Sequence, residues 1–371
     1  MSTDPIHGAD AQRAARLVAA LQAPFEPGSA DAPVVLHTAG GRLVVQRSDT
    51  ALAVLDPVSG DVVRFPAPWP RAFGTTAVSP GADIAVFAGL HALRAVDATG
   101  ATLWEVRHAC WGGECPRLHE EFAEYADDTG EDGEHAYPDS GSAAFSADGK
   151  VVWAHVRGPL AGDGEDAEED ELWLVLDAAD GRLLGRVSTG TMASGSFHTV
   201  HPDPAQMGLS IGEGEEGSPA LWGRLDGGAL SVRKIDDETV LLDVSPSGRR
   251  LLATDVQQDA LYLHDAADGA ILRDLDAADA VPAQSAGRRV YWDFAAAFMA
   301  ENTVVAGTSG SDAGQGPARH WLVGTDDMTL RAHISYPQPV SGPVGPAGDG
   351  TWYTVSEDGS TLSVWELADQ D

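Results

Sequence analysis

Apolar residues along the chain are grouped into short runs, and seven of these runs end in an acidic residue. Several intervals between consecutive acidic ends are about 40 residues, and the longer intervals leave room for inserted loops. Runs this short, bounded by turn-forming residues, are typical of β-strands. The seven runs lie at 52–56, 93–97, 173–177, 222–226, 261–265, 322–326 and 362–366.

Turn signals divide each repeat into strands. Segments such as 79–83 (SPGAD) and 146–150 (SADGK) place Pro, Asp and Gly between two apolar runs, as hairpins require. A repeat of about 40 residues built from such strands indicates a β-propeller with one blade per repeat. We therefore expect an all-β chain in which residues 1–371 form a single seven-bladed propeller. The blades are expected at 33–66, 74–107, 142–188, 196–235, 238–275, 290–335 and 341–367.

The last expected blade has no outer strand of its own after Glu366. The segment 15–24 (ARLVAALQAP) is expected to supply that strand, which would close the ring and remove a sheet edge. The alternative is an amphipathic helix, because residues 11–22 are rich in helix formers.

The acidic ends of the runs are interpreted as turn formers. A leading Asp can accept a hydrogen bond from an amide two residues on, and a following Gly closes the hairpin. This explains Asp56, Asp97, Asp177 and Asp265 without any catalytic role.

Three segments resemble known propeller repeats. Residues 362–369 (LSVWELAD) resemble the end of a WD40 repeat, and 146–153 (SADGKVVW) is similar to the turn of YVTN and TolB-like propellers. Residues 93–106 (LRAVDATGATLWEV) resemble a pyrroloquinoline-quinone-type repeat, with Trp104 at the position of its blade-docking tryptophan. The resemblance implies the propeller fold. The quinone-type motif occurs once, so no quinone cofactor is expected.

Long insertions separate the expected strands, and in an up-down blade all of them fall on one rim. When the loops on only one face of a rigid scaffold are lengthened, that face commonly carries the functional site. Neutral drift of loop length is the alternative, although drift would lengthen both rims. The insertions are 108–141, 158–171, 212–219, 276–289 and 308–319.

The chain is strongly acidic, with a formal net charge of −34 and lysine only at positions 150 and 234. The negative electrostatic field of such a chain repels phosphate backbones and anionic membranes. We therefore expect no nucleic-acid partner and no membrane partner. A basic protein or peptide, or a metal ion, suits it better. The charge can also serve solubility or adaptation to high salt alone.

The first residues, MSTDPIHGADAQ, show no signal-like pattern, and no apolar stretch approaches a membrane span in length. A cytoplasmic location is therefore expected, with Cys110 and Cys115 as thiols.

The 108–141 insertion carries the clearest candidate chemistry. His108, Cys110, Cys115 and His119 offer two sulfur and two nitrogen ligands, a set that suits tetrahedral zinc. Two alternatives stay open: a local disulfide or redox pair, and burial of Cys110 and Trp111 as apolar anchors under the loop. No other cofactor is expected.

Acidic residues dominate parts of two insertions, 120–134 and 162–171. They are interpreted as solvated loops, with attraction of a basic partner or binding of a cation as alternatives.

Further candidates lie where inner strands begin at the expected channel mouth. His198, Asp293 and Tyr291 could form a general acid–base site, and Tyr291, Trp292, His198 and Trp111 could line a ligand pocket. Ser142 and Thr75 lie at equivalent strand starts. The alternative is that Tyr291 and Trp292 pack between blades.

Taken together, these patterns favour a WD40-like scaffold that binds a protein or peptide on an acidic, insertion-bearing rim. The alternative is an enzyme or metal-binding propeller with a small-molecule site under the 108–141 insertion. The sequence does not decide whether the protein is an enzyme, but the lack of familiar catalytic motifs favours a scaffold.

Overall fold

The computed structural model describes residues 11–369, apart from residues 114, 116, 129–132, 165, 166, 168, 286 and 315. Strands supply nearly all of its regular structure, which confirms the all-β prediction. The helices are single turns. They are η1 (Arg71–Phe73), η2 (Phe122–Glu124), η3 (Gly214–Glu216), α1 (Ala277–Ala280) and α2 (Ser309–Asp312).

Contacts between residues divide the chain into two compact units. Unit 1 comprises Met1–Gln46, Leu55–Gly60 and Glu238–Asp371, and unit 2 comprises Arg47–Val54 and Asp61–Asp237. The organisation of residues 1–371 as a single domain stays a prediction.

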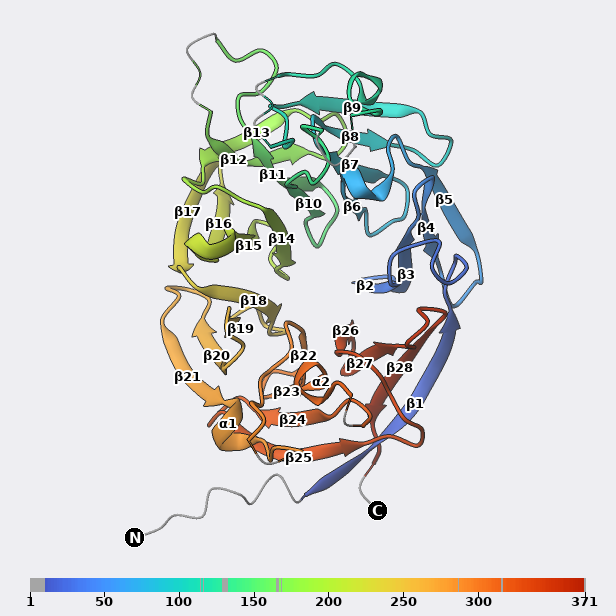
Figure 1. Cartoon of the computed structure of the whole chain (residues 1–371), viewed down its shortest axis with the longest axis vertical. Coiled ribbons are helices and arrows are strands. Elements are labelled where there is room, and N and C mark those ends of the chain that lie inside the picture. Colours follow the sequence, from blue (N-terminus) through green and yellow to red (C-terminus); the bar gives the residue numbers. More distant parts are fainter. Residues whose placement is uncertain are drawn as a thin grey trace. The chain divides into compact units, whose positions relative to one another are not determined.

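Unit 2 contains three four-stranded antiparallel sheets, and in each of them the strands lie in sequence order (Figure 1). This arrangement follows from the short turns that join most of the consecutive strands. The strands are β6 (Gly74–Val78), β7 (Ala85–Gly89), β8 (Ala92–Val96), β9 (Thr102–Arg107), β10 (Ser142–Phe145), β11 (Val151–Arg157), β12 (Glu171–Asp177), β13 (Leu183–Ser188), β14 (Gly195–Val200), β15 (Gln206–Gly212), β16 (Ala220–Asp226) and β17 (Ala229–Asp236).

Unit 1 contains a sheet of the same kind and an eight-stranded sheet. The larger sheet has the order β22-β23-β24-β25-β1-β28-β27-β26. The strands of the smaller sheet are β18 (Thr239–Val244), β19 (Arg250–Asp255), β20 (Ala260–Asp265) and β21 (Ile271–Asp276). Those of the larger sheet are β22 (Ala296–Ala300), β23 (Thr303–Gly307), β24 (His320–Gly324), β25 (Thr329–Ser335), β26 (Gly345–Gly348), β27 (Thr351–Val355), β28 (Thr361–Leu367) and β1 (Gln12–Gln22).

The segment near the N-terminus is a strand and not a helix. β1 pairs antiparallel with β28, from Ala15 opposite Leu367 to Gln22 opposite Thr361. At its start it also pairs in parallel with β25, where Gln12 lies opposite His333. The hydrogen bonds offered by the edge of β28 therefore override the helix propensity of the segment.

Four further strands precede the first sheet of unit 2. β2 (Val34–Thr38) and β3 (Gly41–Arg47) pair antiparallel, and β4 (Ala51–Leu55) and β5 (Val62–Pro66) follow in the sequence.

Four of the seven acidic ends form turns, as predicted, whereas Glu366 lies within β28 opposite Arg16. The Asp56 carboxylate accepts a hydrogen bond from the Val58 amide at 2.8 Å, and Asp97 accepts one from the Thr99 amide at 2.8 Å. Asp177 and Asp265 accept equivalent bonds from Ala179 and Ala267. The Val58 amide lowers the pKa of Asp56, and the Thr99 hydroxyl, followed by backbone amides, lowers the pKa of Asp97, because these hydrogen bonds stabilise the charged form.

Trp104 joins two neighbouring sheets of unit 2. Its side chain is buried with Leu93 on one sheet and with Val152 and Leu174 on the next, and its indole N–H donates to the Ala178 carbonyl at 2.9 Å. This is the docking role that the resemblance of residues 93–106 implied. Large buried aromatic side chains of this kind stabilise each unit mainly by removing apolar surface from water.

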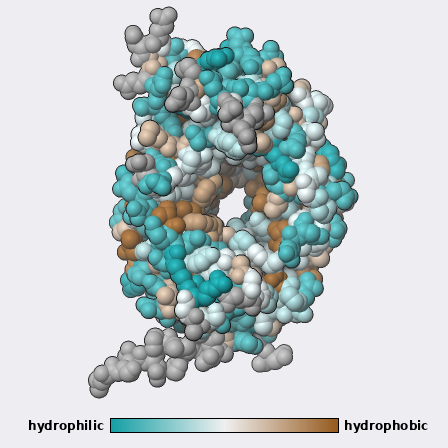
Figure 2. All heavy atoms as spheres, in the orientation of Figure 1, coloured by the Kyte–Doolittle hydropathy of each residue, from teal (hydrophilic) through white to brown (hydrophobic). Residues whose placement is uncertain are grey.

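The face of the molecule seen in Figure 2 is covered mostly by hydrophilic residues, as the net charge of −34 leads one to expect. Among the described residues, no helix has the length and apolar character needed to span a membrane.

Candidate metal centre in the 108–141 insertion

The 108–141 insertion connects β9 to β10 within unit 2 and is tied to the ends of neighbouring strands. The His108 amide donates to the His91 carbonyl and the Trp111 amide to the Leu90 carbonyl, both at 2.9 Å. The Arg157 guanidinium, at the end of β11, donates to the carbonyls of Cys110 and Gly113, each at 3.1 Å. These bonds fix the first turn of the insertion on the sheet.

Four buried side chains of the insertion converge on one point. Cys110, Cys115, His119 and His135 each place one potential ligand atom so that all four atoms lie within 4.8 Å of one another. Cys110 Sγ is 3.3 Å from His135 Nε2, and Cys115 Sγ is 3.3 Å from His119 Nε2. The group therefore presents two sulfur and two nitrogen atoms to a shared centre.

A carboxylate stands behind each of the two imidazoles. Glu124 Oε2 lies 3.1 Å from His119 Nδ1, and Asp128 Oδ2 lies 3.0 Å from His135 Nδ1. A carboxylate at Nδ1 holds the tautomer in which Nε2 carries the lone pair, so both Nε2 atoms are free to act as ligands. Amide hydrogen bonds, first from Glu120, together with His119 lower the pKa of Glu124, so this carboxylate stays charged.

Tyr125 forms the inner wall of the group. It is buried, and its ring centroid lies 4.7 Å from that of His135 in a stacked arrangement and 4.8 Å from that of His119. Its hydroxyl contacts His91 Nδ1 at 2.6 Å, which links the insertion to the turn between β7 and β8. Burial raises the pKa of Tyr125, so the hydroxyl stays protonated.

The two cysteines are free thiols. Burial, followed by the proximity of Cys115, raises the pKa of the Cys110 thiol to about 12, although the Gly112 amide donates to its sulfur at 3.2 Å. Without a bound metal ion the Cys110 thiol is therefore protonated at neutral pH.

The structure groups His135, and not His108, with the other three residues of the predicted ligand set. His108 is fully buried, and its Nδ1 contacts the carbonyl of Ala109 at 2.8 Å, away from the thiols. His135 belongs to the same insertion, and its place in an acidic run is the only sequence signal that could have suggested it. Cys110, Cys115 and His119 do come together as expected.

Trp111 does not line a ligand pocket. Its side chain is buried, and its ring centroid lies 5.7 Å from that of His155. It serves as an apolar anchor under the insertion, which was the alternative interpretation of this residue.

His198 and Ser142 meet in a hydrogen-bonded cluster of unit 2, with His198 Nδ1 3.0 Å from Ser142 Oγ. Trp173 donates its indole N–H to His198 Nε2 at 3.1 Å, and Ser142 also contacts Ser196 Oγ at 2.8 Å. Burial lowers the pKa of His198 to about 3, so the imidazole is neutral. Both ring nitrogens are thus engaged by neighbours. Thr75 makes a different hydrogen bond: its hydroxyl donates to the Gly141 carbonyl at 3.2 Å.

Asp293 belongs to unit 1 and His198 to unit 2, so the expected acid–base pairing of these two residues stays a prediction. Asp293 accepts hydrogen bonds from the Ser309 amide at 3.0 Å, the Ser309 hydroxyl at 2.7 Å and the Gly310 amide at 2.9 Å. Burial raises its pKa. Its carboxylate therefore holds the start of the short helix α2.

One aromatic neighbour of Asp293 is also structural. Trp292 is fully buried in the core of unit 1, and its indole N–H donates to the Leu275 carbonyl at 3.0 Å, so it cannot face a ligand. Tyr291 is half-buried, with the Arg289 guanidinium 5.5 Å from its ring centroid.

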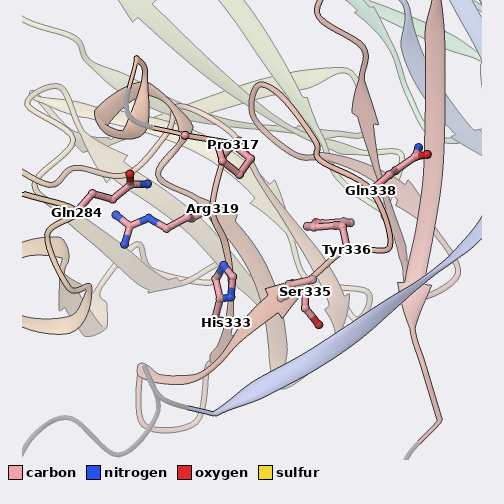
Figure 3. A pocket seen from close by; sticks show the side chains of 10 residues that line it. Gln284, Pro317, Arg319, His333, Ser335, Tyr336 and Gln338 are labelled. Carbon is pink, nitrogen blue, oxygen red and sulfur yellow. The ribbon is translucent and has the colours of Figure 1, made fainter.

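A pocket of about 330 Å³ lies between the two insertions of unit 1 and β25. Figure 3 shows Gln284, Arg319 and His333 toward one side of this pocket and Tyr336 and Gln338 toward the other. The Arg319 guanidinium is already paired with the buried Asp312 carboxylate at 2.7 Å, and the Tyr336 hydroxyl contacts His320 at 2.7 Å. The pocket has the size of a small-molecule site, but its strongest polar groups are engaged by the protein.

Comparison with known proteins identifies the fold. No family model matches the chain, and no curated protein sequence matches it. Two of the similar solved structures match over nearly their whole lengths. The β-propeller domain of Cps50 (Swd1) from Myceliophteria thermophila has a TM-score of 0.54 at 11% identity, covering 95% of this chain and 100% of that one. The hydrazine synthase of Kuenenia stuttgartiensis has a TM-score of 0.56 at 12% identity, covering 94% and 99%.

These similarities confirm that the chain has a β-propeller fold. At 11% and 12% identity these similarities show the fold and say nothing about function, because propellers have many unrelated functions.

Proposed function

We propose that this protein is a non-catalytic, WD40-like scaffold that binds a basic peptide segment of a protein partner on the insertions of unit 2. The observation that carries the proposal is that two acidic insertions of this unit are joined into one surface. His108 and Leu160 form an isolated antiparallel bridge between them, and the Ala109 amide donates to the Pro159 carbonyl at 2.9 Å.

The described part of this surface is acidic with exposed apolar side chains. Glu120 is 82% exposed, and Glu121, Glu134 and Glu169 are also exposed. Tyr137 is 84% exposed and Leu118 is 43% exposed. Carboxylates attract a basic partner over long distances, while an aromatic and an aliphatic side chain supply contact area once the partner has docked.

The finer architecture is part of the proposal. Seven blades, with β1 completing the last one beside β28, would give a closed and rigid support for the insertions. The rigid support matters because loops bind partners well only when a scaffold positions them.

The proposal is tested with two immobilised peptide sets of equal length, one rich in Arg and Lys with interspersed Tyr and Leu, the other with Glu in place of the basic residues. The triple variant E120K/E121K/E134K is compared with a control that reverses Asp226 and Asp274, two exposed acids outside the insertions. We expect the wild type and the control to retain basic peptides at low salt, and the triple variant to lose them. Equal retention of both peptide sets, or unchanged retention by the triple variant, would refute the proposal.

A further inference from the structure

We propose that Cys110, Cys115, His119 and His135 bind one Zn²⁺ ion in a closed tetrahedral site that folds the 108–141 insertion. The inference does not depend on partner binding. It rests on the geometry of the four side chains and on the residues behind them.

The spacing of the ligand atoms fits a zinc tetrahedron. Zn–S distances of about 2.3 Å and Zn–N distances of about 2.0–2.1 Å place neighbouring sulfur and nitrogen ligands roughly 3.5 Å apart. Cys110 and His135 meet at 3.3 Å, Cys115 and His119 meet at 3.3 Å, and all four atoms lie within 4.8 Å. Small adjustments of side-chain torsions suffice to bring every ligand into range.

The chemical types of the four ligands indicate which metal ion the group would bind. Two thiolates and two imidazoles in a tetrahedral set favour Zn²⁺ over Mg²⁺ and Ca²⁺, which prefer six or more oxygen ligands. The carboxylates of Glu124 and Asp128 at the two Nδ1 atoms are the usual partners of zinc-bound imidazoles.

The site has the character of a structural centre. Four protein ligands leave no coordination position for water or substrate, and all four side chains are buried. This distinguishes it from catalytic zinc, which keeps an open position. A zinc enzyme on this insertion is therefore disfavoured.

The ion would hold together a segment with little regular secondary structure of its own. Between β9 and β10 the described regular structure is the single turn η2, and the ligands come from positions as distant as 110 and 135. Metal binding that joins such distant positions supplies folding free energy directly. The surface proposed to bind a partner would then be ordered by zinc.

The test uses full-length protein expressed in zinc-supplemented medium, purified without a histidine tag or chelator, and analysed by inductively coupled plasma mass spectrometry. We expect about one zinc ion per chain in the wild type, as four protein ligands imply. H135A and C115S should lose it. H108A should keep it, which separates the ligand set seen in the structure from the one expected from sequence, and H37A removes an exposed imidazole as a control.

Because a ligand variant can fail to fold, the wild type is also titrated with Co²⁺ after removal of bound metal. Tetrahedral coordination with thiolates gives intense visible bands and a sulfur-to-cobalt charge-transfer band. Wild-type protein with neither zinc nor the cobalt bands, or H135A with undiminished zinc, would overturn the proposal. Loss of zinc in H108A instead of H135A would do the same. Peptide binding is measured separately, so failure of either proposal is recognised independently.

Discussion

Tyr125 and His135 stack on each other, with ring centroids 4.7 Å apart and an interplanar angle of 19°. The Tyr125 hydroxyl also contacts His91, which lies in the turn between β7 and β8. One buried side chain thus shields the Cys–His group and attaches it to a sheet. The centre and the propeller scaffold are therefore coupled through Tyr125.

This coupling predicts different outcomes for two substitutions of Tyr125. Y125F keeps the stacking and loses the hydrogen bond to His91, so it should lower the free energy of unfolding by about 1 kcal/mol. Y125A also leaves a cavity and should cost about 3–5 kcal/mol and weaken metal retention. Urea denaturation and metal analysis of both variants check this. Equal stability of the two variants would show that the ring itself contributes nothing.

The carboxylates behind the imidazoles are predicted to tune metal affinity without being ligands. D128N and E124Q should each weaken zinc binding by about 10- to 100-fold, because the hydrogen bond that orients and polarises the imidazole is weakened. Competition with a chromophoric zinc chelator measures the change. Both side chains are partly exposed, so the variants should fold. D127N, at an exposed neighbouring acid, is the matched control and should bind zinc as the wild type does.

Asp243 is predicted to make unit 1 less stable as the pH rises. It accepts hydrogen bonds from the Phe298 amide at 2.7 Å and the Val244 amide at 2.8 Å, yet burial raises its pKa from 3.8 to about 7. Between these two values the folded state holds a proton that the unfolded state has released. The contribution of Asp243 to the free energy of unfolding therefore falls between about pH 4 and about pH 7. It is constant below and above this range.

The variant D243N removes this titration. Free energies of unfolding in urea at pH 4.5, 5.5, 6.5 and 7.5 should show the wild type losing stability relative to D243N as the pH rises. A constant difference between the two proteins would contradict the assignment of a raised pKa to Asp243.

β1 is predicted to be essential for the stability of unit 1. Removing residues 1–22 takes away the partner of β28 from Thr361 to Leu367 and exposes an unpaired edge. The truncated protein should unfold at a lower temperature and self-associate, as differential scanning fluorimetry and light scattering would show. An unchanged melting temperature and a monomeric truncated chain would argue against closure of the last blade by β1.

The repeated apolar runs predicted the fold well, because strand and turn signals are local. Asp56 and Asp97 illustrate this, since each forms its turn with an amide two residues away. Trp104 was also placed correctly, because its repeat resembles one whose tryptophan docks neighbouring blades.

The candidate sites were predicted only where they are local in sequence. Cys110, Cys115 and His119 lie within ten positions of one another, and they do converge. His135 was missed because its contact with Cys110 depends on the path of the intervening loop, which no periodic pattern encodes. Trp292 was misassigned because its burial depends on packing against Leu252 and Leu261, far away in the sequence.

Zinc K-edge X-ray absorption of the purified, untagged protein tests the central claim about the 108–141 insertion most directly. The zinc centre predicts two sulfur scatterers at about 2.3 Å and two imidazole nitrogens at about 2.0–2.1 Å, with no open position. A first shell without sulfur, or one with more than four scatterers, would contradict it.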